Sequence, residues 1–143
     1  RSALYLADKS GRFIATDLEQ RWATIQWLFF QMAAIGPMFG QVGYFNKFAG
    51  REIGDKRPLQ RYVAEAKRLL VIMDARLDAR PWLMGEDYGI IDIATIGMVQ
   101  NLITFYEARE LVDFDHYCNV GAWLDRALVR PAVQRGLAIP KRA

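Results

Sequence analysis

The segment from Ile90 to Glu107 constrains the fold of this chain more than any other. Its residues are nearly all apolar. An acidic residue, Asp92, lies close to its start. A helix at a protein surface carries a polar face, so a helix that is apolar on every side is a buried one. Such a helix needs other elements around it, which predicts a core with this segment at its centre.

The surrounding elements are predicted to be helices too. Apolar residues recur at helical spacing, and no stretch alternates apolar and polar residues as a half-buried strand does. Gly36-Pro37 falls inside the longest helix, where proline lacks an amide donor and clashes one turn back, so we expect a break or kink there. The predicted fold is therefore all-α. Its other helices cover residues 3–9, 58–80, 116–128, 131–136 and a long segment from a cap at Thr16 or Asp17 to about Gly50.

The composition is that of one globular domain. The 143 residues are 52% apolar and 24% charged, which is enough apolar material for a core. The net charge is +3, but acids and bases interleave, as in Arg57-Arg61-Glu65-Lys67-Arg68. We interpret this pattern as a mixed solvated surface and expect no nucleic-acid partner, although a mildly positive field attracts a small anion.

Several further classes of protein are disfavoured by particular residues. The single cysteine, Cys118, leaves no internal disulfide to form and fits a reducing compartment. A single histidine argues against a His/Cys site, so we expect no metal. The most apolar stretch, residues 27–48, is interrupted by polar residues, whereas a membrane span needs roughly 20 apolar ones. We expect no membrane association, and without a signal peptide at the start we expect a cytoplasmic protein.

Three stretches, taken in order, resemble the C-terminal domain of the glutathione S-transferase superfamily. Residues 5–13 resemble the passage out of that family's thioredoxin-like domain, and residues 82–94 resemble its central-helix capping motif. Residues 123–126 followed by 130–133 resemble the end of its penultimate helix. Because all three occur at the family's spacing, an unrelated helical bundle is disfavoured.

The resemblance sets the expected domain organisation. Residues 27–31 and 36–41 look most like the bacterial Nu class and its yeast prion-related relatives, which are glutathione-dependent disulfide reductases or peroxidases more than conjugating enzymes. The resemblance implies a glutathione S-transferase C-terminal-like helical bundle over residues 14–143. It also implies that residues 1–13 are the tail of a thioredoxin-like domain and a linker, with the rest of that domain absent. The chain opens inside a predicted helix with no start signal, which suggests that sequence has been removed before Arg1.

The capping motif has a physical reason. In the family, a Ser or Thr N-cap accepts a bond from the third residue's N–H, and an Asp there accepts one from the cap's own N–H. Here these positions are Gly89 and Asp92, so only the Asp half is present. Glycine is a tolerable cap, and an acid favours a helix N-terminus. We interpret Asp92 as structural and expect Asp92→Ala to lower stability by about 1 kcal/mol or more.

The resemblance also places the wall of a substrate pocket around Gly36-Pro37. Aromatic and Met side chains suit a small apolar electrophile or a disulfide, although such a stripe is more often simple core. Arg61 is either a partner for a glutathione carboxylate or a solvated surface residue. Tyr44 and Tyr106 are expected to be core tyrosines, and Cys118 a buried, inert thiol. The predicted wall is Met38, Phe39, Gln41, Val42, Tyr44 and Phe45.

Two functions remain open at this point. In the first, this is the substrate-pocket and dimerisation half of a glutathione-dependent enzyme that reduces disulfides or peroxides, or conjugates electrophiles. Glutathione is then the cosubstrate, and no catalytic residue lies in this chain, because the family's thiol-activating groups belong to the thioredoxin-like domain. In the second, the same fold is a non-catalytic protein-interaction scaffold. The family pairs as homodimers through the long first helix, where the candidate contacts are Arg21, Trp22, Gln26 and Phe29.

Overall fold

The structure is a computed structural model that describes residues 2–139. Within these residues the chain is helical, and β-structure is limited to an isolated bridge between Trp82 and Gly85. The predicted all-α fold is therefore confirmed. The helices are α1 (Ala3–Ser10), α2 (Leu18–Phe30), α3 (Gly36–Asn46), α4 (Arg57–Leu77), α5 (Ile90–Ile103), α6 (Cys118–Leu128) and α7 (Pro131–Leu137).

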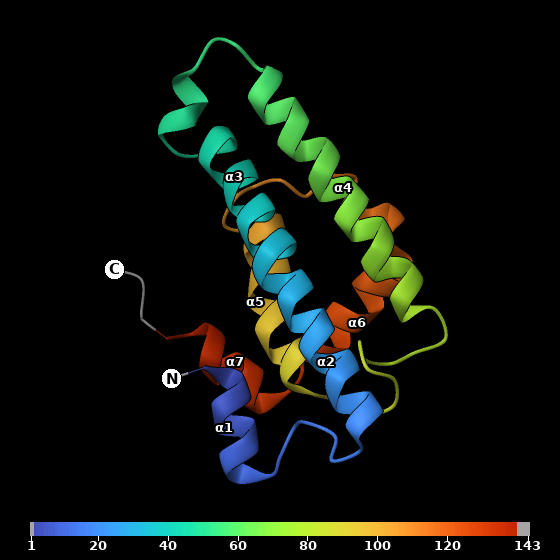
Figure 1. Ribbon diagram of the computed structural model, residues 1–143. Helices are drawn as coiled ribbons and strands as arrows, with labels where there is room; N and C mark the ends of the chain where they lie inside the picture. The colour runs from blue at the N-terminus through green and yellow to red at the C-terminus, as the bar shows by residue number, and fades with distance from the viewer. Residues whose placement is uncertain (1, 140–143) are drawn as a thin grey trace.

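Helices α2 and α3 form one long helix that runs antiparallel to α4 (Figure 1). They are joined by a π-helical turn, Gln31–Ile35, in which the Gly36 amide donates to the Gln31 carbonyl five residues back. Pro37 follows directly, in the first turn of α3. The helix is therefore not broken at Gly36-Pro37. Instead, the irregularity takes the form of a π-helical turn, a wider turn that shifts the hydrogen-bond register where proline offers no donor.

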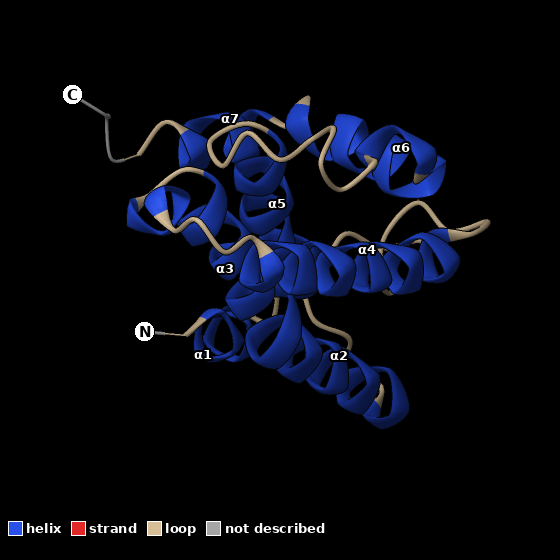
Figure 2. Cartoon of the chain, turned by 90° about the horizontal axis from the view of Figure 1, so that it is seen from above, coloured by secondary structure: helices blue, strands red, loops and turns tan. Residues whose placement is uncertain are grey.

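Helix α5 lies at the centre of the bundle, as its sequence predicts. Seen from above, α1 and α2 lie on one side, α6 and α7 on the other, and α3 and α4 between them (Figure 2). The core is filled by fully buried side chains from α5 itself and from α3, α4 and α6. They include Phe39, Val42, Leu69, Leu70, Met73, Ile91, Val99, Leu102 and Trp123. No helix among residues 2–139 is long and apolar enough to cross a membrane.

The first helix begins within the described residues. The Ser2 hydroxyl accepts a hydrogen bond from the Tyr5 N–H at 3.3 Å, and Gly11 ends the helix with a φ of +64°. The prediction that this helix lacks a start signal is therefore wrong, because Ser2 is its N-cap. Arg1 and residues 140–143 lie outside the described residues, and the division into segments 1–13 and 14–143 stays a prediction.

Candidate functional site

Asp92 lies in the first turn of α5 and is completely buried. Its Oδ2 accepts from the Gly89 N–H at 2.9 Å, which is the half of the capping box that the sequence predicts. Its Oδ1 accepts from the Leu83 N–H at 3.0 Å and from the Trp123 indole N–H at 2.8 Å. Asp92 therefore ties the turn before α5 and helix α6 to the central helix.

A backbone carbonyl satisfies a further amide at the start of α5. The Ile90 N–H donates to the Phe13 carbonyl at 2.8 Å, so the segment between α1 and α2 closes the start of α5. A Cβ atom at Gly89 would lie 3.2 Å from that carbonyl oxygen, which gives glycine a reason at this position. Sequence reasoning missed the contact because Phe13 is distant in the chain and a carbonyl group has no residue signature.

The surroundings of Asp92 suit a structural role. Burial raises the pKa of its carboxyl group, while the hydrogen bonds from Leu83, Gly89 and Trp123 act to lower it. Both carboxylate oxygens are occupied by fixed donors, and the side chain has no exposed surface. A group that transfers protons must be within hydrogen-bond reach of a substrate, and Asp92 is not.

The predicted pocket wall on α3 divides into two faces. Phe39 and Val42 are 1% and 0% exposed and pack inside the core, so the prediction that they line a pocket is wrong. A helix presents only one face to a pocket, and residues three apart share a face, here the one toward the core. Gln41 and Tyr44 are exposed, and Met38 and Phe45 are half-buried, so these four remain accessible.

An aromatic group forms where the end of α3 meets the start of α4. Phe45 stacks on Tyr62 with ring centroids 5.6 Å apart, and Tyr44 meets Phe45 edge to face at 5.0 Å. Gly50 allows the chain to return beneath this group, because a Cβ there would lie 2.8 Å from the Tyr44 ring. The result is a partly exposed aromatic surface where α3 meets α4, and Arg61 is the residue before Tyr62 in the chain.

Arg61 is exposed, and its guanidinium makes no hydrogen bond or ion pair with another residue in the range 2–139. Its charge still acts on Glu65, whose pKa is lowered mainly by hydrogen bonding to Arg68 and in smaller part by Arg61. The guanidinium is therefore available to an anionic ligand.

Three of the four predicted dimer residues lie on an apolar face of α2 that points away from the bundle. Trp22 is 62% exposed and Phe29 71%, and Gln26 is exposed between them. Leu18 and Met32, each 68% exposed, extend this face, which we call the α2 face. Sequence reasoning missed both, although their helical spacing from Trp22 and Phe29 was available as a signal.

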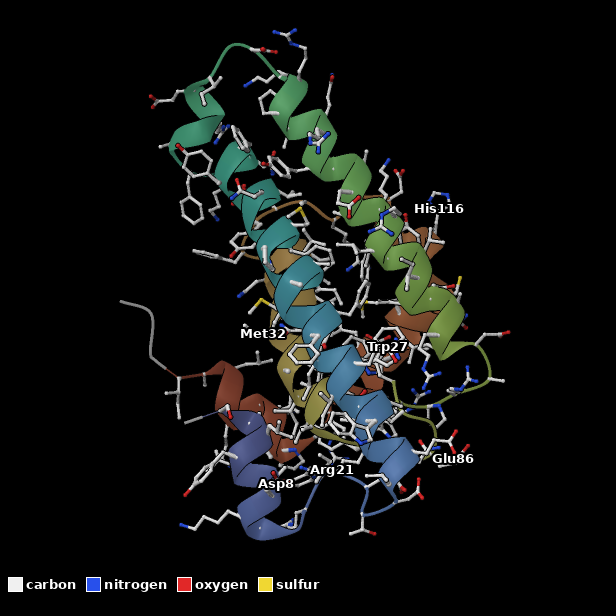
Figure 3. The ribbon with its side chains drawn as sticks, in the orientation of Figure 1. Asp8, Arg21, Trp27, Met32, Glu86 and His116 are labelled. Carbon is white, nitrogen blue, oxygen red and sulfur yellow. The ribbon has the colours of Figure 1, made fainter. Side chains whose placement is uncertain are left out.

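Arg21 has a partner within the chain. Its guanidinium donates to both carboxylate oxygens of Asp8, at 2.7 and 3.1 Å. Figure 3 shows the two side chains side by side, from α2 and α1. This hydrogen bonding lowers the pKa of Asp8. Arg21 therefore links α1 to α2, and its predicted role between two subunits stays a prediction.

Two further side chains differ from expectation. Cys118 is exposed, so the prediction of a buried thiol is wrong. Cys118 is exposed because it is the first residue of α6, which begins at the surface. It also borders a cleft of about 570 Å³. Tyr44 is 43% exposed rather than in the core. Tyr106 is half-buried and packs closely on Gly43, where a Cβ would lie 2.5 Å from the ring.

The chain has clear relatives among known proteins, although no family model matches it. It is 40% identical over 134 residues to the disulfide-bond oxidoreductase YfcG of Escherichia coli, a match that covers 94% of this chain and 59% of YfcG. YghU of Escherichia coli, another disulfide-bond oxidoreductase, is 36% identical over 135 residues, a match that covers 93% of this chain and 46% of YghU. The chain spans about half the length of the curated relatives that it matches.

Solved structures agree with these relatives. A glutathione transferase family member from Pseudomonas fluorescens, with two glutathione bound, is 60% identical with a TM-score of 0.95, over 96% of this chain and 61% of that one. A glutathione transferase from Pseudomonas putida, with one glutathione disulfide bound per subunit, is 54% identical with a TM-score of 0.94, over 96% and 60%. The chain therefore belongs to the glutathione S-transferase superfamily and has the fold of its C-terminal helical domain.

Proposed function

We propose that this chain is the helical half of a glutathione-dependent protein that reduces disulfides. The observation that carries the proposal is the similarity, at 54–60% identity, to structures that hold two glutathione molecules or one glutathione disulfide in a subunit. Those are the reductant and the product of one reaction, in which two glutathione thiols and a substrate disulfide give two substrate thiols and glutathione disulfide. The name of YfcG, a disulfide-bond oxidoreductase, supports the same chemistry.

In this proposal the exposed side chains of α3, together with the start of α4, form one wall of the substrate pocket. Met38, Gln41, Tyr44 and Phe45 supply its apolar and aromatic surface, and the accessible guanidinium of Arg61 pairs with a carboxylate of glutathione. Phe39 and Val42 support this wall from the core side. The groups that activate the glutathione thiol lie outside this chain, in the thioredoxin-like domain that family members carry.

The proposal includes a homodimer in the cytoplasm. The α2 face exposes four large apolar side chains in one line, and a second copy of the chain would bury them. A single exposed cysteine is compatible with a reducing compartment, in which glutathione is itself abundant in its thiol form.

The test is glutathione-dependent reduction of 2-hydroxyethyl disulfide by the complete translated product that contains this chain. We expect turnover that depends on glutathione. We also expect Arg61→Ala to raise the KM for glutathione about tenfold or more, because a hydrogen bond to a charged group contributes about 1.5–3 kcal/mol. The control is Arg68→Ala, which removes an exposed arginine of the same helix whose partner is Glu65.

Two outcomes would contradict the proposal. If the complete protein neither binds glutathione nor reduces the disulfide, the domain is a non-catalytic scaffold. If turnover is present but Arg61→Ala and Arg68→Ala change the KM equally, Arg61 does not contact glutathione, and the pocket wall lies elsewhere on the helices.

A further inference from the structure

A small cleft lies between α6 and the turn that follows α4, at the opposite end of α4 from Arg61 (Figure 1). Its volume is about 320 Å³, at the lower end of the range for small-molecule sites. Two arginines line it, Arg80 from the turn and Arg126 from α6, and its remaining wall includes Leu77, Pro81 and Ala122. The cleft therefore has two positive charges from separate elements beside a mainly apolar wall.

The turn after α4 holds Arg80 at this cleft. Helix α4 ends at Leu77, and Ala79 then takes a φ of +53°, a conformation that residues other than glycine rarely adopt. The Arg80 N–H donates to the Leu77 carbonyl at 3.0 Å, and its guanidinium Nη1 donates to the Arg76 carbonyl at 2.9 Å. The charge of Arg80 in turn acts on Arg76, whose pKa is lowered mainly by burial and in smaller part by that charge.

Arg126 reaches the cleft from α6 and is fixed by the same turn. Its Nη1 donates to the Pro81 carbonyl at 2.8 Å, and its guanidinium carbon lies 5.7 Å from the centroid of the Trp82 ring. A guanidinium has five N–H donors, and Arg80 and Arg126 each use one of them within residues 2–139. Because both residues are exposed, the other donors are accessible to a ligand.

No carboxylate among the described residues forms an ion pair with Arg80 or Arg126. Asp78 and Asp125 are close to them in the chain, but neither lines the cleft. Asp74 extends from α4 to the start of α6, where its Oδ1 accepts from two backbone amides at 2.9 and 3.1 Å. The two guanidiniums therefore lack a counter-ion within this part of the chain.

We propose that this cleft binds the phosphate group of a small phosphate monoester. Such a group has three terminal oxygens and close to two negative charges, which match two guanidiniums, whereas a carboxylate is matched by one. The carbon atoms of the ester lie against Leu77, Pro81 and Ala122. The site shares no residue with the proposed wall on α3 and α4, so it is independent of the disulfide chemistry, and its test does not use turnover.

The probe is phenyl phosphate, titrated into the ¹⁵N-labelled complete translated product that contains this chain. We expect saturable amide shifts at Ala79, Arg80 and Ala122. Phenyl sulfate has a similar shape and one charge fewer, so it should bind about tenfold more weakly. Inorganic phosphate should compete at higher concentration, because it keeps the charge but lacks the apolar body. Excess glutathione should leave the shifts in place.

Two substitutions test the charges. Arg80→Gln and Arg126→Gln should each weaken phenyl phosphate about tenfold or more, because each removes one charge-assisted pair. Arg51→Gln is the matched control. Arg51 is also an exposed arginine, but it lies in the short 3₁₀-helix Ala49–Glu52, near the other end of α4 (Figure 1). It should leave the affinity unchanged.

A third variant tests the cleft with both arginines in place. Ala122→Glu puts a carboxylate into the wall, where it repels the phosphate and pairs with the guanidiniums, so the saturable shifts should disappear. Ala64→Glu is its control, because Ala64 is exposed on α4 outside the cleft. The proposal is overturned if phenyl phosphate gives no saturable shifts or if glutathione displaces it. It is also overturned if Arg80→Gln and Arg126→Gln bind as well as Arg51→Gln, or Ala122→Glu as well as Ala64→Glu.

Discussion

Helices α5 and α2 are both rich in apolar residues, yet the chain covers one and leaves the other bare. Seven residues of α5 are buried, whereas Thr24 is the one buried residue of α2. On α2, Trp22 and Phe29 are more than 60% exposed. Apolar content alone therefore does not place a helix in the core of its own chain. Whether a helix is buried depends on the elements packed around it, and an apolar face left exposed indicates a binding partner.

The starts of the two helices show the same contrast. Helix α2 has an ordinary exposed cap, in which Asp17 accepts from the Gln20 N–H at 2.9 Å. Helix α5 begins inside the protein, where water cannot satisfy its amides. Asp92 and the Phe13 carbonyl take over that task. A buried helix start depends on particular partners, so substitutions there should cost more than any on the α2 face.

The largest effect on monomer stability is expected from Asp92→Ala. It leaves the amides of Leu83 and Gly89 and the indole N–H of Trp123 buried without acceptors. At about 1–3 kcal/mol for each orphaned donor, the free energy of unfolding should fall by about 3 kcal/mol or more. From the sequence alone only the capping bond is visible, which predicts a loss of about 1 kcal/mol or more. Urea unfolding of the two proteins measures the difference.

The control for this loss is Asp125→Ala. Asp125 is exposed on α6 and makes no hydrogen bond with another residue of the described range. Its removal should change stability by less than about 0.5 kcal/mol. If the two alanine variants unfold at the same urea concentration, Asp92 does not hold the bundle together.

On the α2 face, Phe29→Glu should weaken dimer formation rather than lower the stability of the monomer. A charge placed in an apolar interface is desolvated without a partner, so dimer formation should weaken by about 2 kcal/mol or more, roughly 30-fold in the dissociation constant. Because Phe29 is 71% exposed, the monomer should keep its stability within about 0.5 kcal/mol. Sedimentation velocity across a concentration series reports the association.

Val71→Glu is the matched control, since Val71 is 55% exposed on α4, outside the α2 face. It should leave association unchanged. A protein that stays monomeric before any substitution would remove the homodimer from the proposal, and equal effects of the two glutamates would place the interface elsewhere.

The sequence predicted the fold because its main signals are local. The apolar segment 90–107, the helical spacing and Asp92 three residues after Gly89 all act within a few turns. Each has its counterpart in the structure, although the central helix ends at Ile103. The partners that complete the Asp92 junction were not predictable in this way. The Leu83 amide, the Trp123 indole and the Phe13 carbonyl meet it only through tertiary packing.

The candidate pocket was predicted less well for the same reason. The stretch 38–45 has the composition of a binding wall, but composition does not say which helix face points outward. The structure turns Phe39 and Val42 into the core and leaves Gln41 and Tyr44 outside. The prediction that Cys118 is buried was wrong because the exact start of a helix is set by the loop before it, and that loop has no periodic pattern of apolar residues.

A smaller loss is expected for Trp123→Phe. Phenylalanine keeps most of the buried ring but removes the indole N–H that donates to Asp92 at 2.8 Å. The carboxylate keeps its two backbone donors, so the cost should be about 1–2 kcal/mol, less than for Asp92→Ala. Trp27→Phe is the control, because its half-buried indole N–H has no hydrogen bond within residues 2–139. Equal losses would show that ring volume matters and the bond to Asp92 does not.

The smallest effect is a pH dependence that Asp92→Asn should remove. Burial raises the pKa of Asp92 in the folded protein above the ordinary 3.8, so the folded state holds this proton more tightly than the unfolded state. The contribution of this group to stability is then complete below the unfolded pKa and is lost as the pH rises through the folded one.

Exposed carboxylates act in the opposite direction. The pKa values of Asp8, Asp55 and Glu107 are lowered, mainly by hydrogen bonds from Arg21, Arg57 and Lys47, so their contributions are lost as the pH falls. These contributions are shared by both proteins and cancel in the comparison. The stability advantage of the unaltered protein over Asp92→Asn should therefore shrink from acidic pH toward neutrality. An advantage that grows instead would mean that the three donors outweigh burial and that the folded carboxyl group has a lowered pKa.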